Sequence, residues 1–435
     1  MTQDTFSQSL WSAISPPGPE LPRLLGEETA DIVLVGAGFL GMNTALGLAR
    51  AGLKVVLLEA SEPGFGASGR NTGFVVPTLK KALSPSNVVA RFGTRRGEAF
   101  NRMIGGSGER LFSLIRDNGI ACDSEQTGWM QPAHSRAALA ACATQVREWR
   151  ARGFDVQLLD RGETEARTGM TGYHGAMLIP SGGQINPLAW ARGLARLCLS
   201  EGVRIFAGSP VIRLARDGAG WRVHTPGGSV VAPRAVLTTN ALVGKLCSRV
   251  DRAIIPTYSF QIATQKFDAE IQARLLPARS PIADSRRHLF AARWSSDGRI
   301  VGGGLVYPGP FRLARTRRRF EKRFARFLPQ LGQVRAEYAW FGTVAVTLDA
   351  LPRLFRLDRG LWAPIGCNGR GVALTAAYGH ELAQFFAGNT AEEDFVVPVT
   401  QPEPIPMRAM ATAGPYLWLP YSEYRDRIET EAPAE

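Results

Sequence analysis

Residues 31–60 read DIVLVGAGFLGMNTALGLARAGLKVVLLEA, and this stretch decides the fold. Residues 31–35 are short, apolar and β-branched, which predicts a parallel strand buried on both faces. Gly36, Gly38 and Gly41 form a G-x-G-x-x-G pattern, which permits a tight turn, close approach of a pyrophosphate and close packing of helix on strand. The helix is predicted over residues 39–50, with its N-terminal N–H groups facing the phosphates. The stretch therefore predicts a dinucleotide-binding unit.

An acid completes this unit. The second apolar strand, residues 54–58, ends at Glu59, whose carboxylate can accept hydrogen bonds from ribose hydroxyls. A simple βα turn would not require three glycines at this spacing followed by an acid. A membrane span over residues 32–49 is the other alternative, because the segment is uncharged and nearly long enough. The three glycines and Asn43 argue against it.

Two further glycine-rich segments extend the pattern. Residues 64–73 read GFGASGRNTG, a loop with a cation, an amide and many free backbone donors, which can surround a second phosphate or a flavin edge. Residues 366–375 read GCNGRGVALT, again a glycine loop before a predicted helix. Between the two segments, Thr347, Asp349 and Pro352 form T-x-D-x-x-P.

Together these motifs resemble the FAD-dependent D-amino-acid oxidase superfamily, and most of all its γ-glutamylputrescine oxidase-like branch. The resemblance implies an α/β fold with a Rossmann-like FAD-binding domain of the GR2/DAO type and a discontinuous α+β substrate domain on a mixed or antiparallel sheet. It implies that FAD is held by residues of the three motifs and two neighbouring loops: Gly36, Gly38, Phe39, Gly41, Glu59, Ala60, Gly66, Ala67, Ser68, Arg70, Asn71, Gly73, Val211, Asn240, Gly366, Asn368, Gly369, Arg370, Gly371 and Val372.

The family's covalent attachment points are missing from this chain. No histidine occurs between Met1 and Asn101, and Gly342 stands where covalent relatives carry a flavin-linking cysteine, seven residues before Asp349. We therefore expect FAD to bind without a covalent link. The helix after residue 371 would aim its positive end at the flavin pyrimidine and stabilise negative charge there.

The predicted domains alternate along the chain. An N-terminal arm is expected at 1–29 and the FAD-binding domain at 30–78, 160–250 and 340–395. The substrate domain is expected at 79–159 and 251–339, and a C-terminal extension at 396–435.

Composition limits the other possibilities. The chain has 435 residues and five widely spaced cysteines without a C-x-x-C pair, which indicates free thiols and no disulfide framework. The N-terminus lacks a basic segment followed by an apolar one, so a cytoplasmic location is expected. The sequence shows no transmembrane segment, and no cluster that indicates a metal site or a catalytic triad. The oligomeric state stays open.

The net charge of +13 is concentrated partly in residues 315–327, RTRRRFEKRFARF. On a helix, Phe320, Phe324 and Phe327 fall on one side and the cations largely on the other. The simplest interpretation is a surface helix with a solvated basic face. An acidic partner, anionic lipid or nucleic acid are the alternatives, but no nucleic-acid-binding module accompanies the helix, so no nucleic-acid partner is expected.

Substrate contacts are expected on the strands 258–264, 289–294 and 299–305, which would cover the flavin. Their candidates are Tyr258, Phe260, Phe290 and Arg293, with Arg293 gripping a substrate carboxylate. Gly302, Gly303 and Gly304 leave room for a flat ligand. The alternative is that these side chains point away, because the parity of each strand is not determined by the sequence.

The resemblance implies oxidation of an amine or amino acid by hydride transfer to flavin N5, followed by imine hydrolysis. Dioxygen would then reoxidise the flavin and yield hydrogen peroxide. A dehydrogenase of the same fold, which passes electrons to a quinone or an electron-transfer protein, is the first alternative. A flavin-binding subunit without catalysis of its own is the second.

Overall fold

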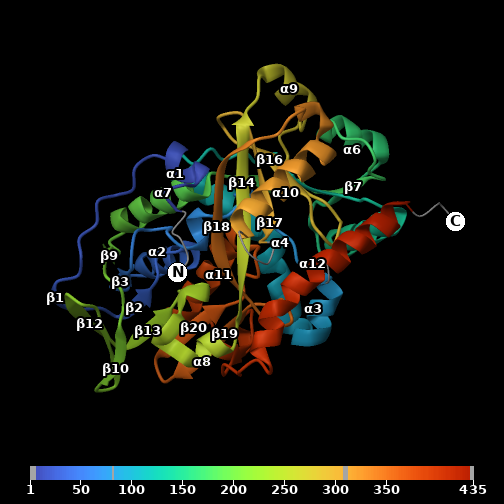
Figure 1. The fold of residues 1–435 in the computed structure, drawn as a ribbon. Coiled ribbons are helices and arrows are strands. Elements are labelled where there is room, and N and C mark those ends of the chain that lie inside the picture. Colours follow the sequence, from blue (N-terminus) through green and yellow to red (C-terminus); the bar gives the residue numbers. More distant parts are fainter. Residues whose placement is uncertain (1–5, 81–82, 307–311, 432–435) are drawn as a thin grey trace.

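The fold is built around two large β-sheets, as a computed structural model of the protein shows (Figure 1). The structure describes residues 6–80, 83–306 and 312–431. The first sheet has seven strands in the order β21-β19-β20-β13-β2-β3-β9. Its strands are β2 (Ile32–Val35), β3 (Val55–Leu58), β9 (Arg204–Phe206), β13 (Arg234–Leu237), β19 (Arg353–Asp358), β20 (Leu361–Ile365) and β21 (Val399–Thr400).

The central strands of this sheet run parallel; the β19–β20 pair is antiparallel, and β21 pairs with β19 in parallel. One face packs against three helices, α2 (Phe39–Arg50), α7 (Pro187–Ser200) and α11 (Gly371–Phe386). The other face packs against a four-stranded sheet of β1 (Gly26–Thr29), β10 (Arg213–Asp217), β11 (Gly220–His224) and β12 (Gly228–Ala232). This is the layered arrangement expected of a Rossmann-like FAD-binding domain.

The second sheet has eight strands in the order β18-β14-β17-β16-β15-β5-β7-β6. It is mixed, because β15 and β5 pair in parallel while the other described pairs are antiparallel. Its strands are β5 (Trp129–Pro132), β6 (Gln157–Leu159), β7 (Ala176–Ile179), β14 (Ile255–Lys266), β15 (Ile282–Ala283), β16 (Ala291–Trp294), β17 (Arg299–Leu305) and β18 (Ala336–Val346).

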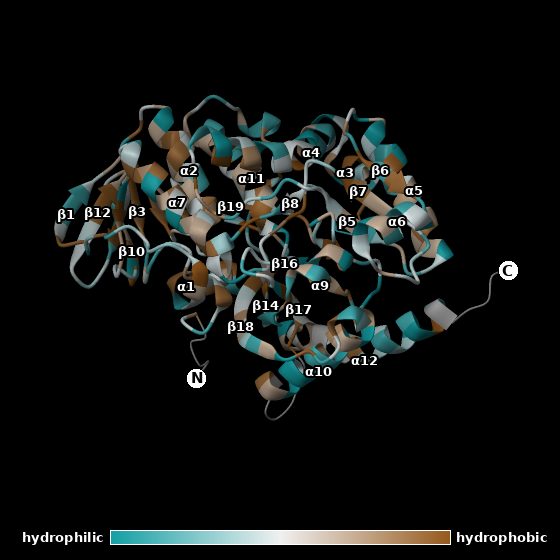
Figure 2. Ribbon diagram, turned by 90° about the horizontal axis from the view of Figure 1, so that it is seen from above, coloured by the Kyte–Doolittle hydropathy of each residue, from teal (hydrophilic) through white to brown (hydrophobic). Residues whose placement is uncertain are grey.

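Helices α10 (Arg312–Phe327) and α12 (Arg408–Glu431) form the outer layer over β14 and β17 (Figure 2). The remaining helices are α1 (Leu10–Ile14), α3 (Pro85–Phe92), α4 (Thr94–Asp117), α5 (Arg136–Arg150), α6 (Arg161–Thr168), α8 (Ser248–Arg252) and α9 (Ala269–Arg274). A short pair, β4 (Phe74–Val75) and β8 (Gly183–Gln184), connects the two lobes. Single 3-10 turns occur at Ala67–Gly69, Asn240–Leu242, Gly244–Cys247, Pro329–Leu331 and Glu392–Asp394.

Helix ends follow the local chemistry of the sequence. Helix α7 begins at Pro187, and the Asn186 side chain accepts the Ala189 N–H at 3.1 Å. Residues 85–117 form two helices, α3 and α4. Gly93 separates them at φ +77°, a left-handed conformation that a helix cannot continue through.

The two sheets do not follow the predicted segment boundaries at every point. Strand β7 belongs to the second sheet, although residues 160–250 were assigned to the FAD-binding domain. Strand β18 begins at Ala336 and lies across the boundary at residue 340. The N-terminal arm is more regular than expected, since α1 buries Trp11 and β1 pairs with β12.

Candidate active site

A cavity of about 790 Å³ runs between the two sheets. At one end lie the N-terminus of α2, the loop 67–72 and the loop 366–371 before α11. At the other end lie β14, β16 and β17, together with the loop 286–289 and Trp418 of α12. The three glycine-rich segments found in the sequence thus meet the second sheet in one continuous space.

The glycines of the first motif have distinct roles. Gly36 adopts φ +108°, and a side-chain carbon on Gly41 would lie 2.1 Å from the Gly36 carbonyl oxygen. Gly41 therefore lets α2 pack directly on the end of β2. Gly38 differs, because it lines the cavity and a side-chain carbon there would meet only the Ser68 hydroxyl, at 3.0 Å. Ser68 in turn accepts the Phe39 N–H at 2.9 Å, so this loop is bonded to the first turn of α2.

Glu59 lies at the end of β3, as predicted, and its carboxylate accepts hydrogen bonds from the Ala37 N–H at 2.8 Å and the Ser61 N–H at 2.9 Å. Burial raises the pKa of Glu59, and the backbone hydrogen bonds oppose this shift. These bonds fix the carboxylate beside the glycine turn.

The loop 64–73 is organised by Asn71. Its amide donates to the carbonyls of Ala67 and Ser68 at 3.1 and 2.7 Å, and its oxygen accepts the Gly73 N–H at 2.8 Å. Trp11 of α1 donates to the Asn71 carbonyl at 2.8 Å. Arg70 turns the other way, because its Nε donates to the Phe65 carbonyl and its guanidinium lies over the Phe6 and Phe65 rings. Asn71 lines the cavity and Arg70 does not.

The loop 366–371 lines the cavity along its whole length. Asn368 adopts φ +51°, donates to the Gly366 carbonyl and accepts the Thr347 N–H at 2.9 Å. This bond connects the second glycine loop to the T-x-D-x-x-P segment. Arg370 is half-buried and donates to the carbonyls of Thr78 and Leu79, and the loss of contact with water lowers its pKa to about 10.

The predicted cofactor residues fall into two groups. The cavity is lined by Gly38, Phe39, Ala67, Ser68, Asn71, Asn240, Gly366, Asn368, Gly369, Arg370, Gly371 and Val372. The others lie behind or beside this lining: Gly36, Gly41, Glu59, Ala60, Gly66, Arg70, Gly73 and Val211. A dinucleotide fits the first group chemically, since two helix N-termini and two glycine loops supply backbone donors where side chains would obstruct them.

The predicted substrate contacts on β14 and β16 do not face the cavity. Phe260 stacks on Phe320 of α10 with a ring separation of 5.8 Å, and Tyr258 packs on Phe341 at 6.2 Å. Phe290 stacks on Phe327 at 4.7 Å. None of the three predicted aromatic side chains lines the cavity. On β14 it is Ser259 and Gln261 that do, because successive side chains along a strand alternate between its faces.

Arg293 also fails to reach the cavity, and its predicted contact with a substrate carboxylate is wrong on this geometry. The side chain is 1% exposed and donates to the carbonyls of Ile185 at 2.6 Å and Thr72 at 3.2 Å. Its guanidinium lies over the ring of Trp11, and burial lowers its pKa to about 10. Arg293 therefore fastens the flavin-side loop to the second sheet. Ala291, two residues earlier, is the residue of β16 that lines the cavity.

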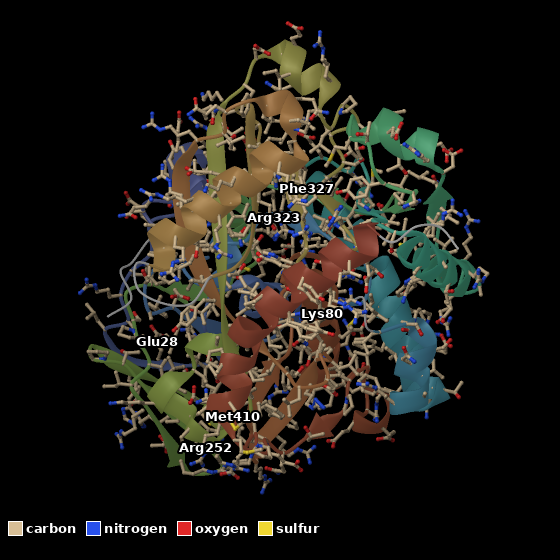
Figure 3. All side chains as sticks on the ribbon, turned by 45° about the vertical axis from the view of Figure 1, so that its right-hand side comes forward. Glu28, Lys80, Arg252, Arg323, Phe327 and Met410 are labelled. Carbon is tan, nitrogen blue, oxygen red and sulfur yellow. The ribbon has the colours of Figure 1, made fainter. Side chains whose placement is uncertain are left out.

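Besides Arg370, three cations line the cavity: Lys80, Arg286 and Arg287. Arg286 pairs with the buried Asp284 and stacks on Phe327, and Arg287 pairs with Glu429. Lys80, which is labelled in Figure 3, has no acidic partner among the described residues. Burial lowers the pKa of Lys80 to about 8, and the nearby charge of Arg370 adds to this shift. No motif marks these cations in the sequence, because their position depends on how two separate loops meet.

Gln261 is the most buried polar group of the lining on β14. It is 5% exposed, and its Nε2 donates to Ser259 Oγ at 2.8 Å. Its Oε1 finds no hydrogen-bond partner within the described part of the chain. Gly303 leaves the space beside it, since a side-chain carbon there would lie 2.2 Å from Oε1. Gly303 thus makes room for the Gln261 side chain.

The described residues hold one group that could bind a metal ion, formed by His134, Asp426 and Glu429. Arg287 already pairs with both carboxylates, so we assign the group to the attachment of α12. Within residues 6–80, 83–306 and 312–431, no helix combines the length and apolar character needed to cross a bilayer.

Comparison with known families agrees with this site. A family model described as FAD dependent oxidoreductase (DAO) matches residues 31–385. The chain belongs to this family. The DAO resemblance inferred from the sequence motifs is thereby confirmed, and FAD is the cofactor that the family uses. The oxidoreductase class follows for this DAO-family chain.

Relatives in sequence share most of the DAO-family chain. Gamma-glutamylputrescine oxidoreductase of Escherichia coli is 29% identical over 92% of this chain and 93% of its own length. Glycine oxidase of Geobacillus kaustophilus is 24% identical over 80% of this chain and 90% of its own. Both relatives are named for oxidation of an amine or amino acid, the substrate class that the family comparison supports for this enzyme.

Solved structures confirm the fold. The crystal structure of the Geobacillus glycine oxidase has a TM-score of 0.68 at 20% identity and covers 84% of this chain and 96% of its own. L-proline dehydrogenase from P. horikoshii has a TM-score of 0.71 at 17% identity and covers 85% and 96%. The predicted DAO-type fold is therefore confirmed.

Proposed function

We propose that this enzyme oxidises the carbon–nitrogen bond of an amine that carries a carboxylate, with dioxygen as the final electron acceptor. The observation that supports this most is the single cavity, which joins the FAD-type glycine loops to a wall with three cations. The gamma-glutamylputrescine and glycine named for two relatives both contain an amine and a carboxylate.

The hydrogen-bond donors at the FAD end of the cavity are backbone N–H groups of the chain. Backbone N–H groups at the start of α2 and in the loop 67–71 would hold the phosphates, and the start of α11 would face the flavin. FAD, when bound, supplies a two-electron acceptor for the substrate's C–H bond. The chain's own task is then to orient the substrate amine and to keep the reacting carbon near the acceptor.

Lys80 is the proposed contact for the substrate carboxylate. Arg286 and Arg287 already have carboxylate partners, whereas the charged and titratable groups that act on Lys80 among the described residues are Arg370 and Cys367. A cation without an acid gains most from an incoming carboxylate, because the pair then forms in a partly water-excluded space.

Gln261 is the proposed contact for the substrate nitrogen. Its Oε1 has an unused acceptor, and an amine N–H is the complementary donor. Oxidation removes two electrons and two protons from the C–N unit. Water then adds to the resulting imine and releases a carbonyl compound and an amine, while dioxygen takes up the two electrons and two protons as hydrogen peroxide.

A dehydrogenase is the second candidate. The fold resembles glycine oxidase and L-proline dehydrogenase to a similar degree, so the fold does not distinguish the acceptor. The exposed cations of α10 favour a second binding partner, which an oxidase does not need.

A simple experiment distinguishes the oxidase from the dehydrogenase. The purified yellow enzyme is mixed with γ-glutamyl-amines and amino acids in the presence and absence of oxygen, while flavin absorbance and peroxide are recorded. An oxidase bleaches without oxygen, recovers its colour rapidly in air and forms one peroxide per substrate. Slow recovery in air without stoichiometric peroxide would assign the dehydrogenase. No bleaching with any amine carrying a carboxylate would contradict the proposed substrate class.

A further inference from the structure

The outer face of α10 carries a continuous row of cations. Helix α10 contains eight basic residues and one acid, Glu321. The exposed cations are spaced so that they lie on one side of the helix: Arg315, Arg318, Arg319, Lys322 and Arg326. The opposite side holds Phe320 and Phe324, which are 5% and 1% exposed and pack under the helix. The helix is therefore fixed with its basic row towards solvent.

The outer face of α12 is apolar. Met410, Tyr421, Tyr424 and Ile428 are 68%, 47%, 63% and 44% exposed, although they are large and mostly hydrophobic. Their spacing places them on one side of the helix, opposite the buried Ser422 and Asp426. Such a row of exposed apolar side chains usually marks a binding surface.

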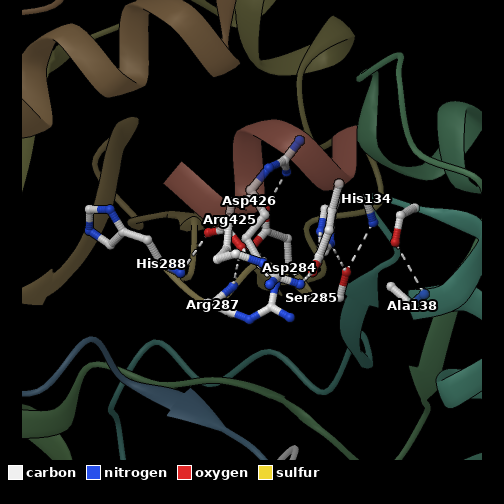
Figure 4. Close-up of polar contacts among 11 residues, drawn as sticks. His134, Ala138, Asp284, Ser285, Arg287, His288, Arg425 and Asp426 are labelled. Atoms are coloured by element: carbon white, nitrogen blue, oxygen red, sulfur yellow. Dashed lines mark hydrogen bonds and ion pairs between the residues drawn. The ribbon is translucent and has the colours of Figure 1, made fainter. Parts of the chain in front are cut away.

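The two helices are held in one layer. Glu423 of α12 pairs with His288 and with Arg319 of α10, and Arg323 of α10 donates to the His288 carbonyl. Asp426 accepts the backbone N–H groups of Arg287 and His288 at 2.8 Å each (Figure 4). Figure 2 shows both helices along the same edge of the molecule. We call the basic face of α10 and the apolar face of α12 the α10–α12 platform.

We propose that the α10–α12 platform docks flat on an anionic membrane surface. A helix that carries tyrosine and aliphatic groups beside a row of arginines has the composition of an interfacial helix, with rings at the headgroup level and cations on the lipid phosphates. An acidic protein partner would match the cations but not the neighbouring apolar row. The described helices do not span a bilayer, so this attachment is peripheral.

The docking would give the cavity a fixed orientation. Trp418 of α12 is 47% exposed and also lines the cavity, and Arg287, which α12 holds through Glu429, lines it too. The platform and one wall of the cavity are thus parts of the same helix. A docked enzyme would open this side of its cavity towards the lipid headgroups.

Vesicle sedimentation with the FAD-loaded enzyme tests the proposal. The probes are vesicles of phosphatidylcholine with phosphatidylglycerol and vesicles of phosphatidylcholine alone, each at low and high salt. We expect the wild type to bind the anionic vesicles, salt-sensitively, and to bind the neutral vesicles far less. The Arg318→Glu/Lys322→Glu variant should bind the anionic vesicles at least roughly 30-fold more weakly. The control is Lys54→Glu/Arg136→Glu, which makes the same charge change at exposed sites elsewhere and should bind like the wild type.

A second pair of variants tests the apolar row. Tyr424→Ser/Ile428→Ser should weaken binding roughly tenfold, whereas Leu25→Ser/Ile212→Ser, at side chains 76% and 62% exposed on the other lobe, should not. Turnover with a soluble dye acceptor should be unchanged in all four variants, which shows that the site is intact. The proposal is overturned if the wild type does not sediment with anionic vesicles, or if each control loses as much binding as its test variant. Capture by polyglutamate without vesicle binding would also overturn it and assign an acidic protein partner.

Discussion

Arg293 is a buried cation and Lys80 a half-buried cation beside the cavity, and their partners differ. Arg293 is surrounded by backbone carbonyls that use its donors, whereas Lys80 has no acid among the described residues and lines the cavity. Burial lowers the pKa of both side chains, to about 10 for Arg293 and about 8 for Lys80. The arginine therefore has a structural role, and the lysine is the group that can respond to a ligand.

The substitution Lys80→Met removes the charge and keeps the length of the side chain. Loss of a charge-assisted contact costs roughly 1.5–3 kcal/mol, so kcat/KM should fall about ten- to a hundredfold for a substrate with a carboxylate. The uncharged amide of the same substrate should be affected little, and Lys80→Arg should retain part of the preference. Equal losses for acid and amide would rule out a carboxylate contact.

The pH dependence of this contact follows from the lowered pKa of Lys80. The side chain is charged below a pH of about 8 and neutral above it, so carboxylate binding is present at lower pH and is lost as pH rises through about 8. The ratio of wild-type to Lys80→Met kcat/KM cancels the titration of the substrate amine. We expect this ratio to fall above a pH of about 8; a ratio that stays flat from neutral to alkaline pH would contradict the assignment.

The substitution Arg293→Met should act on stability and leave substrate preference alone. It leaves buried carbonyls of Thr72 and Ile185 without their donor, which lowers the free energy of unfolding by about 3 kcal/mol. Thermal unfolding and the acid-to-amide ratio of kcat/KM measure the two effects. Arg136→Met, at an exposed site, is the control for stability. A changed acid-to-amide ratio of kcat/KM with unchanged thermal stability would show that Arg293 contacts the substrate.

Side-chain direction is what the sequence could not provide. The strand around Tyr258 was predicted, and β14 includes it, but the pattern did not tell which face Ser259 and Gln261 would take. Aromatic residues are common both in cores and in substrate sites, and here Phe260 and Phe290 belong to the core under α10. The decisive constraint is the packing of α10, which lies far along the chain from β14.

At the scale of elements, local sequence signals were sufficient to predict where a helix or strand begins or ends, wherever a capping residue or a glycine sets that boundary. The predicted range 39–50 matches α2. Strand β9 is short, Arg204–Phe206, because Gly208 takes φ +56° and Pro210 cannot continue the ladder. The arm before residue 30 has too little periodicity to predict α1, which forms because Trp11 is buried against the flavin-side loop.

Gly38 and Gly41 should respond differently to substitution. Gly41→Ala places a carbon 2.1 Å from the Gly36 carbonyl and forces α2 away from β2, so both flavin content and stability of the apoprotein should fall. Gly38→Val places its side chain where the pyrophosphate should lie, so flavin binding should be lost while the apoprotein stays close to wild-type stability. Flavin absorbance and apoprotein Tm separate the two. Normal flavin content in Gly38→Val would contradict its assigned role.

At the scale of the whole molecule, the site predicts how the cofactor is retained. Gly342 lies against Arg70 and Ala67 and offers no nucleophile at the position used by covalent relatives. Acid precipitation of the holoenzyme should therefore release all of the yellow colour into the supernatant, and redissolved protein should have no flavin absorbance. Colour retained in the washed pellet would show a covalent bond.

The order of strands in the seven-stranded sheet has a consequence for synthesis on the ribosome. Strand β13 lies between β2 and β20, and the glycine loop before α11 follows β20 directly. The first glycine turn is made early, yet its partner at residues 366–371 emerges more than three hundred residues later. A nascent chain thus carries an unfinished nucleotide pocket through most of translation, and the vitamin-derived cofactor can be loaded only when the polypeptide is almost complete.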